Sequence, residues 1–325
     1  MKLSIFAAAL CAVVAFPISA QQFPTKPIHV IVPTSPGGLN DLTSRALGAQ
    51  VAESVGQPVI VENRPGAGSM IGMSALAKSA PDGYTVALTT SEPLTYNPLL
   101  YAKLPYDPDH DFAPVSLLVT IPGILVAHPS APASTFPELI AYAKAHPGAL
   151  NYATWGPGSI PGVYLDWINR QNGVSITAVP YKGAGLAVPA TVAGEVHLTY
   201  IGLGFVMSQI RGGKLKPIAV ATSQKRSPAL PSVPALAEFN SEPGLAAYFG
   251  VWAPARTPNA LLDRLSLEFA KAMRGPKFQE IATQQILDIV GSTPAEFAAF
   301  LKEDRATATR VYKTLGIKPL DVPHT

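Results

Sequence analysis

Short apolar runs alternate with amphipathic segments along the first hundred residues. The β-branched runs Ile28 to Val32, Val59 to Val61 and Val86 to Thr89 are typical of strands. Between them, Leu39 to Val55 and Ser69 to Lys78 carry apolar residues at helical spacing. Strands that alternate with helices in this way predict a βαβαβ unit with a parallel sheet.

The alternation restarts after an extended stretch, Val115 to Ala127, which Pro122 and Gly123 interrupt. Beyond it we expect helices at 136–145, 160–172, 185–193 and 205–211, and strands at 150–154, 176–179, 196–201 and 216–221. A proline-marked segment, 227–239, then leads away from this second α/β unit.

The last part of the chain predicts a strand at 248–253 and helices at 258–273, 276–285 and 294–315. Nothing follows these helices, so we expect them to cover the first lobe. The fold class is then α/β, with two Rossmann-like lobes: residues 21–122 plus 226–325 form one lobe and 123–225 the other. Two crossings between the lobes predict a hinged cleft.

The first twenty residues have the pattern of a cleavable signal peptide. Lys2 precedes an apolar run from Leu3 to Phe16, and Ala20 offers a small residue for cleavage. The run is shorter than the roughly 17 to 25 residues that a spanning helix needs. The only cysteine, Cys11, lies inside it, so we expect neither a disulfide nor a lipid anchor. We therefore predict that the chain is exported.

Charge argues against a nucleic-acid partner. The chain has 24 Lys plus Arg against 21 Asp plus Glu, with no basic run.

Two glycine loops carry the first chemical signal. VIVPTSPGGLND and VIVENRPGAGSM each lead from an apolar run through glycine into a helix. Unpaired amides at a helix start, aided by the helix dipole, favour an anion. Neither loop has the spacing of a nucleotide-binding fingerprint, so a small carboxylate is preferred; ordinary strand-to-helix turns are an equal alternative. The second lobe has its own glycine loops, TWGPGS and PYKGAG, which we expect to face the same cleft.

Several long motifs resemble one family. PTKPIHVIVPTSPGGLND, GQPVIVENRPGAGSMIG, YAKLPYDPDHDFAPVSLL, VPYKGAG and RSPALPSVPALAEF together resemble the Bug receptors, the periplasmic binding proteins of tripartite tricarboxylate transporters. The resemblance covers essentially the whole chain after the leader. It implies a Venus-flytrap, type II-like binding protein that captures a small carboxylate without cofactor, metal or catalysis. Membrane permease subunits are the implied partners.

The resemblance also implies a set of site residues. One ligand carboxylate is expected on the loops after the first two strands, at Ser35, Pro36, Gly37, Gly38, Asp41, Arg64, Pro65, Gly66, Ala67 and Gly68. Further expected ligand-binding positions are Ser91, Asn97, Trp155, Gly158, Ser159, Lys182, Gly183, Tyr200 and Ile201.

Several of these residues have a structural alternative. Asp41 is more typical of a residue that caps or pairs with its helix start. Arg64 could clamp a carboxylate or pair with Glu62. Asn97 could form a turn before proline, Ser159 could cap its helix, and Lys182 could be solvated.

Two departures from the family bear on the ligand. Ile201 stands where members commonly carry an aspartate, and Ile160 to Val163 stand where members often show a histidine. Without that acidic group an amine has no partner, which weakens amino acids as ligands. With Trp155 and Tyr200 as pocket-wall candidates, an apolar or aromatic mono- or dicarboxylate is favoured.

Two other functions were weighed. An exported hydrolase lacks support, since the chain has no GxSxG or HExxH motif. His110, with Asp107, Asp109 and Asp111, is the nearest approach to a metal cluster, and we interpret it as a loop. A ligand sensor that docks on a membrane signalling protein remains open, because transport and sensing use the same closed-lobe surface.

Overall fold

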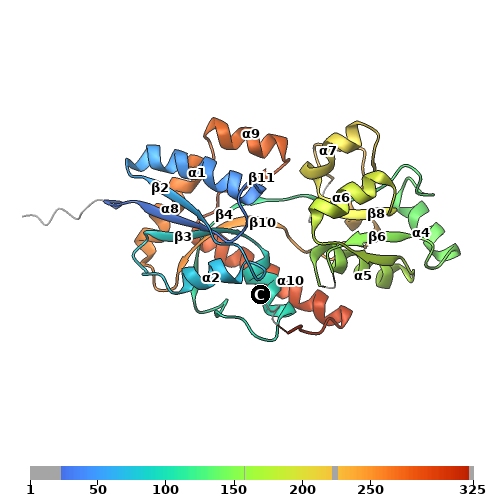
Figure 1. Ribbon diagram of the computed structural model, residues 1–325, viewed down its shortest axis with the longest axis horizontal. Helices are drawn as coiled ribbons and strands as arrows, with labels where there is room; N and C mark the ends of the chain where they lie inside the picture. Colours follow the sequence, from blue (N-terminus) through green and yellow to red (C-terminus); the bar gives the residue numbers. More distant parts are fainter. Residues whose placement is uncertain (1–22, 157, 222–225, 322–325) are drawn as a thin grey trace, which may run out of the picture.

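The protein folds into two lobes, each built around its own β-sheet (Figure 1). The structure, a computed structural model, describes residues 23–156, 158–221 and 226–321. The predicted signal peptide, residues 1–20, lies outside the described residues. Within them, no helix combines the length and the apolarity needed to cross a membrane.

The first sheet has six strands in the order β11-β4-β10-β3-β1-β2. They are β1 (Ile28–Val32), β2 (Val59–Asn63), β3 (Thr85–Thr90), β4 (Phe112–Thr120), β10 (Tyr248–Pro254) and β11 (Asp288–Ile289). Strand β1 pairs in parallel with both β2 and β3, which confirms the predicted parallel βαβαβ unit. Strand β10 is antiparallel to β3 and β4, so the sheet as a whole is mixed.

The second sheet has five strands in the order β7-β6-β8-β5-β9. They are β5 (Gly123–Ala127), β6 (Asn151–Thr154), β7 (Thr177–Pro180), β8 (Leu198–Gly202) and β9 (Lys216–Ala221). Strand β6 is parallel to β7 and β8, whereas β5 is antiparallel to β8 and β9.

Helices cover both sheets at nearly the predicted places. They are α1 (Leu39–Val55), α2 (Met70–Ala77), α3 (Asn97–Leu100), α4 (Phe136–Ala145), α5 (Ile160–Asn172), α6 (Ala184–Ala193), α7 (Leu203–Arg211), α8 (Asn259–Ala272), α9 (Pro276–Gln284) and α10 (Pro294–Leu315). A π-helix, η1 (Glu92–Tyr96), and a 3₁₀ helix, η2 (Leu236–Phe239), complete the set. Sequence patterns missed β11, α3 and η1, which are too short to show a period.

The lobes are joined where β4 ends and β5 begins. Only Ile121 and Pro122 separate the two strands, which belong to different sheets, as the proline-glycine break indicated. Gly123 has no room for a side chain, because a Cβ there would lie 2.0 Å from the hydroxyl oxygen of Tyr200. The chain returns between η2 and β10, through residues 240–247.

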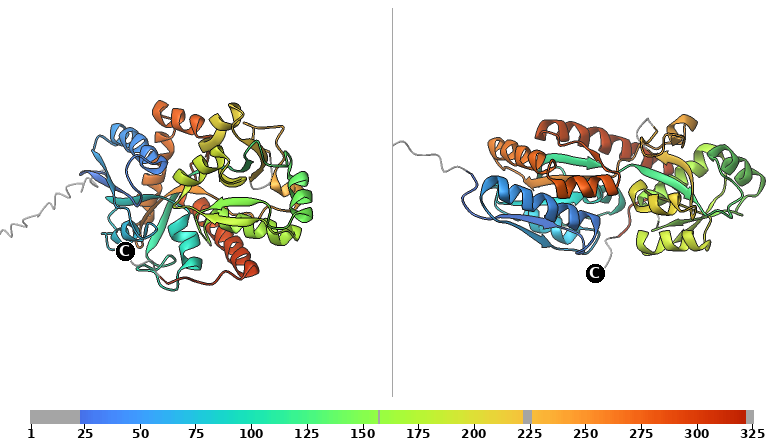
Figure 2. Two further views of the ribbon diagram at one scale, coloured as in Figure 1. Left: turned by 45° about the vertical axis from the view of Figure 1, so that its right-hand side comes forward. Right: turned by 90° about the horizontal axis from the view of Figure 1, so that it is seen from above.

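Helix α10 does more than cover the first lobe, which corrects the sequence prediction. Its N-terminal half packs through Phe297 and Leu301 against the first sheet. Its C-terminal half places Ala308, Val311 and Tyr312 in one hydrophobic core with residues of the second lobe. The helix therefore extends along both lobes, as the views in Figure 2 also show. Its amphipathic pattern predicted a covered face but could not say which sheet covers it.

Candidate functional site

The glycine loops of the first lobe lie at one edge of its sheet. Because β1, β2 and β3 are parallel, their carboxyl ends meet there. Hydrogen bonds join the loops that follow. The Arg64 amide donates to Val32 O (2.8 Å), and the Asn63 side chain donates to Thr34 O (3.1 Å).

The loop after β1 is exposed at Ser35, Pro36, Gly37 and Gly38. Helix α1 starts after Gly38 with no hydrogen bond from a capping side chain, so the loop leaves a helix start open to an anion. Gly37 has φ +82°, a conformation that favours glycine.

Asp41 supports this loop from inside helix α1, which agrees with the structural interpretation of its role. Its carboxylate is 3% exposed and accepts a hydrogen bond from the Gly37 amide (2.9 Å). Arg45 also pairs with it. Burial opposes the ionisation of Asp41, but the hydrogen bonds from Gly37 and Arg45 outweigh it and lower its pKa.

The loop after β2 has an unusual backbone. Four successive residues, Gly66 to Ser69, have positive φ angles of +123°, +46°, +60° and +73°. Ala67 and Ser69 adopt this conformation at a steric cost, and such strain clusters at binding sites. The buried Asn97 side chain, 4% exposed, donates a hydrogen bond to Gly68 O (2.8 Å) and holds the loop in place.

The Arg64 side chain forms an ion pair with a nearby carboxylate, that of Glu62. Its guanidinium forms two hydrogen bonds with the Glu62 carboxylate, of 2.8 and 3.0 Å. Both side chains are exposed, so this is the local surface pair that the sequence analysis offered as an alternative to a ligand clamp. Ser91, by contrast, lies 1% exposed where β3 ends.

The second lobe repeats the arrangement at the carboxyl ends of β6 and β7. Ser159 caps α5 by accepting a hydrogen bond from the Gly162 amide (3.3 Å), and its hydroxyl donates to Gly156 O (2.6 Å). Capping was the safer of the two roles expected for it. Trp155 is half-buried against the apolar residues of this lobe. Lys182 is exposed, and Gly183, with φ +99°, is the N-cap of α6.

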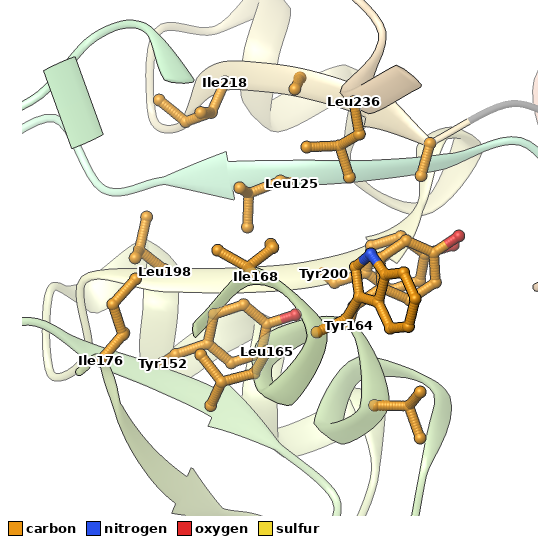
Figure 3. Packing of buried hydrophobic residues seen from close by; sticks show 14 of the residues in the cluster. Leu125, Tyr152, Tyr164, Leu165, Ile168, Ile176, Leu198, Tyr200, Ile218 and Leu236 are labelled. Carbon is orange, nitrogen blue, oxygen red and sulfur yellow. The ribbon is translucent and has the colours of Figure 1, made fainter. Parts of the chain in front are cut away.

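Tyr200 and Ile201 lie in the cores of the second lobe rather than at this edge. Tyr200 is 6% exposed and stacks on Tyr164, with ring centroids 4.0 Å apart (Figure 3). Ile201 is 5% exposed and packs in a different core. Strand β8 is flanked by β6 and β5, so its alternating side chains point to two covered faces of the sheet. These two residues therefore offer a ligand little surface in this conformation.

The loop after β6 contacts the first lobe. The Tyr312 hydroxyl, on α10, donates a hydrogen bond to Gly158 O (2.8 Å). A Cβ on Gly158 would lie 2.0 Å from the side chain of Leu100, at the end of α3. Helix α3 also presents Asn97 to the loop after β2, so the structure brings loop 66–69 and Gly158 to the same short helix.

Two groups near this meeting point were missed by sequence reasoning. Glu92 follows Ser91 directly and is exposed, and Tyr101 follows α3 with its hydroxyl 3.8 Å from the position of a Cβ on Gly68. Both residues lie in the segment that follows β3, and this position could have marked them as candidate site residues from the sequence alone. Of this segment, Ser91 and Asn97 were predicted as site residues, whereas the carboxylate between them was not.

A separate cavity of about 130 Å³ lies beside the two crossings. Its lining includes Ile121, Pro122, Glu242 and Asp288. Glu242 accepts hydrogen bonds from the Tyr164 hydroxyl (2.6 Å) and the Gly244 amide (2.9 Å). Burial raises the pKa of Glu242 to about 7, although both hydrogen bonds act in the opposite direction.

No cluster of three or more His, Cys, Asp or Glu side chains suited to a metal occurs in the described part of the chain. His110 pairs with Asp107 (2.9 Å) in an exposed loop, and Asp109 pairs with Arg305 instead.

Comparison with known proteins finds one matching family and several similar sequences. Residues 43–317 match the sequence profile described as "Tripartite tricarboxylate transporter family receptor". Protein BugT of Bordetella pertussis is 34% identical over 307 residues, which cover 94% of each chain. A second B. pertussis protein, named only as a UPF0065 protein, is 32% identical over 92% of this chain and 93% of its own.

Solved structures agree with the predicted two-lobed fold. An R. palustris protein solved with adipate has a TM-score of 0.79 and 32% identity, over 92% of this chain and all of its own. MatC from Rhodopseudomonas palustris, solved with bound malate, has a TM-score of 0.74 and 30% identity, over 89% of this chain and 99% of its own. The two-lobed periplasmic-binding-protein fold is thereby confirmed.

Proposed function

The chain belongs to the tripartite tricarboxylate transporter receptor family, and from this premise we propose that it captures a small carboxylate between its lobes. Solute-binding receptors make up this periplasmic family. We further propose that the loaded protein delivers its ligand to membrane permease subunits, and that residues 1–20 direct its export.

The observation that carries the proposal is the meeting of glycine loops from both lobes at helix α3. Loop 66–69 is held by Asn97, and Gly158 packs against Leu100. Helix α1 starts nearby without a side-chain cap. Each helix start contributes only about 0.3 to 1 kcal/mol to anion binding at an exposed site, and up to about 2 when partly buried. Micromolar affinity needs about 8 kcal/mol, so several loops must act together as the lobes close.

The similar proteins support the choice of a carboxylate. Two of them were solved with adipate and with malate, both dicarboxylates. In the loop after β1 no Lys or Arg is present, so an anion there must be held by neutral donors, the backbone amides and the hydroxyl groups of Thr34 and Ser35.

The test is a thermal-shift screen of the exported protein against mono-, di- and tricarboxylates, with hits confirmed by calorimetry. The amide of each acid serves as its matched control, because it keeps the shape and removes the charge. At 100 times its dissociation constant a ligand adds about 2.7 kcal/mol of stability. A hit with an acid and not with its amide supports the proposal; a response to neutral compounds alone contradicts it.

A further inference from the structure

Glu92 is the one exposed side chain in an otherwise buried segment. It directly follows Ser91, at the carboxyl end of β3, and begins the π-helix η1. Ser91 and the residues from Pro93 to Asn97 are all buried. The segment therefore packs into the first lobe on every side except the one where the Glu92 side chain emerges.

The surroundings of Glu92 belong to both lobes. Burial raises the pKa of Tyr101 and of Tyr312, and the negative charge of Glu92 acts in the same direction on each. The Glu92 carboxylate is thus close enough to both hydroxyls to affect them. Tyr312 is bonded to Gly158 of the second lobe, and Tyr101 lies beside Gly68 of the first. Glu92 begins η1, which continues directly into α3, and α3 contacts loop 66–69 through Asn97 and Gly158 through Leu100.

The carboxylate is exposed and also partly desolvated. Burial among surrounding protein atoms raises the pKa of Glu92, although its side chain is accessible to solvent. The Glu92 side chain is therefore flanked by protein atoms while it stays open to solvent. Across the described residues, its side chain has no hydrogen bond and no ion pair within the protein.

An unpaired carboxylate in this position discriminates between ligands by charge. A second carboxylate of a ligand would be repelled by it, whereas an ammonium group would be attracted. Both effects are stronger beside protein atoms than in bulk water, because the effective dielectric constant is lower there.

We propose that Glu92 determines the specificity of the cleft, and that the preferred ligand carries a cationic amine in addition to the carboxylate held by the glycine loops. This inference rests on the proposed function. It revises the argument from Ile201 against amino acids, because the acidic partner for the amine comes from the first lobe instead of the second.

The test compares acids that share a chain and differ in one group. For chains of four to six carbons, the set contains the plain monocarboxylate, the dicarboxylate, and the acids aminated at the far end or next to the carboxylate. Affinities are measured by calorimetry at pH 7.5 for the intact protein and for Glu92→Gln. The matched control is Glu195→Gln, which removes an exposed carboxylate that follows α6.

We expect one aminated acid to bind at least about tenfold more tightly than its plain and dicarboxylate analogues. Glu92→Gln should reduce that preference to below about threefold without weakening the binding of the plain acid, whereas Glu195→Gln should keep the preference. A preserved affinity for the plain acid also shows that the variant is folded.

The two possible failures are distinguishable. If a dicarboxylate binds at least as tightly as every aminated acid, the assignment of Glu92 is wrong while the carboxylate receptor stands. The assignment is equally wrong if Glu92→Gln leaves the preference for the amine intact. If no acid of any kind binds, the proposed function fails, and this inference with it.

Discussion

The hydroxyl of Tyr312 donates a 2.8 Å hydrogen bond to the carbonyl of Gly158, and this bond ties the C-terminal helix to a glycine loop of the other lobe. Tyr312 is 3% exposed, in the core that α10 shares with the second lobe. The position of Gly158 therefore depends on a helix that starts in the first lobe.

Replacing Tyr312 by Phe tests this bond. The variant leaves the Gly158 carbonyl unpaired in a buried position, so we expect a loss of about 1 to 3 kcal/mol in the free energy of unfolding. Urea denaturation measures it, and ligand affinity should fall as well because loop 156–159 belongs to the proposed site. Tyr142→Phe is the control, since the Tyr142 hydroxyl has no hydrogen bond among the described residues. Equal stability of Tyr312→Phe and the unaltered protein would contradict the prediction.

Asn97→Ala should weaken ligand binding through the strained loop. Without the amide at 2.8 Å from Gly68 O, the four positive-φ residues lose their support. We expect the dissociation constant to rise about tenfold or more, with a loss of stability of about 1 to 3 kcal/mol.

The matched control is Asn172→Ala, which removes hydrogen bonds to Ile168 O and to the hydroxyl of Ser241 at the start of the returning crossing, neither of which involves loop 66–69. It should lower stability and leave affinity unchanged. Calorimetry measures the affinity and thermal denaturation the stability. A similar loss of affinity in both variants would mean that Asn97 does not act through loop 66–69.

Glu242 should make stability depend on pH. Its pKa rises from an ordinary value of 4.5 to about 7 on folding, so the folded state binds the proton more tightly than the unfolded state. This contribution is fully present below pH 4.5 and disappears as the pH rises through 7. The loss is at most about 1.4 kcal/mol for each pH unit within this window.

A urea-denaturation series in pH, comparing the unaltered protein with Glu242→Gln, measures this effect. The unfolding free energy of the unaltered protein minus that of Glu242→Gln should decrease from pH 4.5 to 7 and stay level above that. Glu195→Gln removes an exposed carboxylate. The difference in unfolding free energy between the unaltered protein and this variant should not change with pH. A difference that increases with pH would show that the folded protein favours the ionised Glu242.

Gly204→Ala should push the lobes apart. A Cβ on Gly204, in the first turn of α7, would lie 2.1 Å from the carbonyl oxygen of Gln285, which follows α9. Backbone atoms cannot move aside as a flexible side chain can. We therefore expect the free energy of unfolding to fall by about 1 to 3 kcal/mol and the radius of gyration to increase. Small-angle scattering measures the latter. Gly185→Ala is the control, because a Cβ there meets open space; an unchanged scattering curve for Gly204→Ala would contradict the prediction.

Local pattern was enough to predict most of the fold. Alternating strand and helix signals placed β1 to β3 and the helices between them, because periodicity depends on neighbouring residues alone. Pro122 and Gly123 marked the crossing between the sheets for the same reason. The glycine loops after β1, β2 and β6 were located in this way, and parallel pairing places the first two at one edge of the first sheet and the third at an edge of the second.

Contacts between residues that are distant in the sequence could not be predicted from local patterns. Tyr200 was assigned to the pocket wall, but the central position of β8 buries it against Tyr164. The amphipathic face of α10 was evident, yet only the tertiary structure shows that it serves both lobes.

The sequence by itself determined the family, the α/β class and the loops that offer backbone amides, because each is encoded in a continuous segment. The tertiary structure decided which side chains stand among those loops. Glu92 is an ordinary carboxylate after a strand in the sequence, and only the fold brings its charge near Tyr101 and Tyr312, which are nine and 220 residues away. Electrostatic and packing effects depend on distance in space, and folding alone sets that distance.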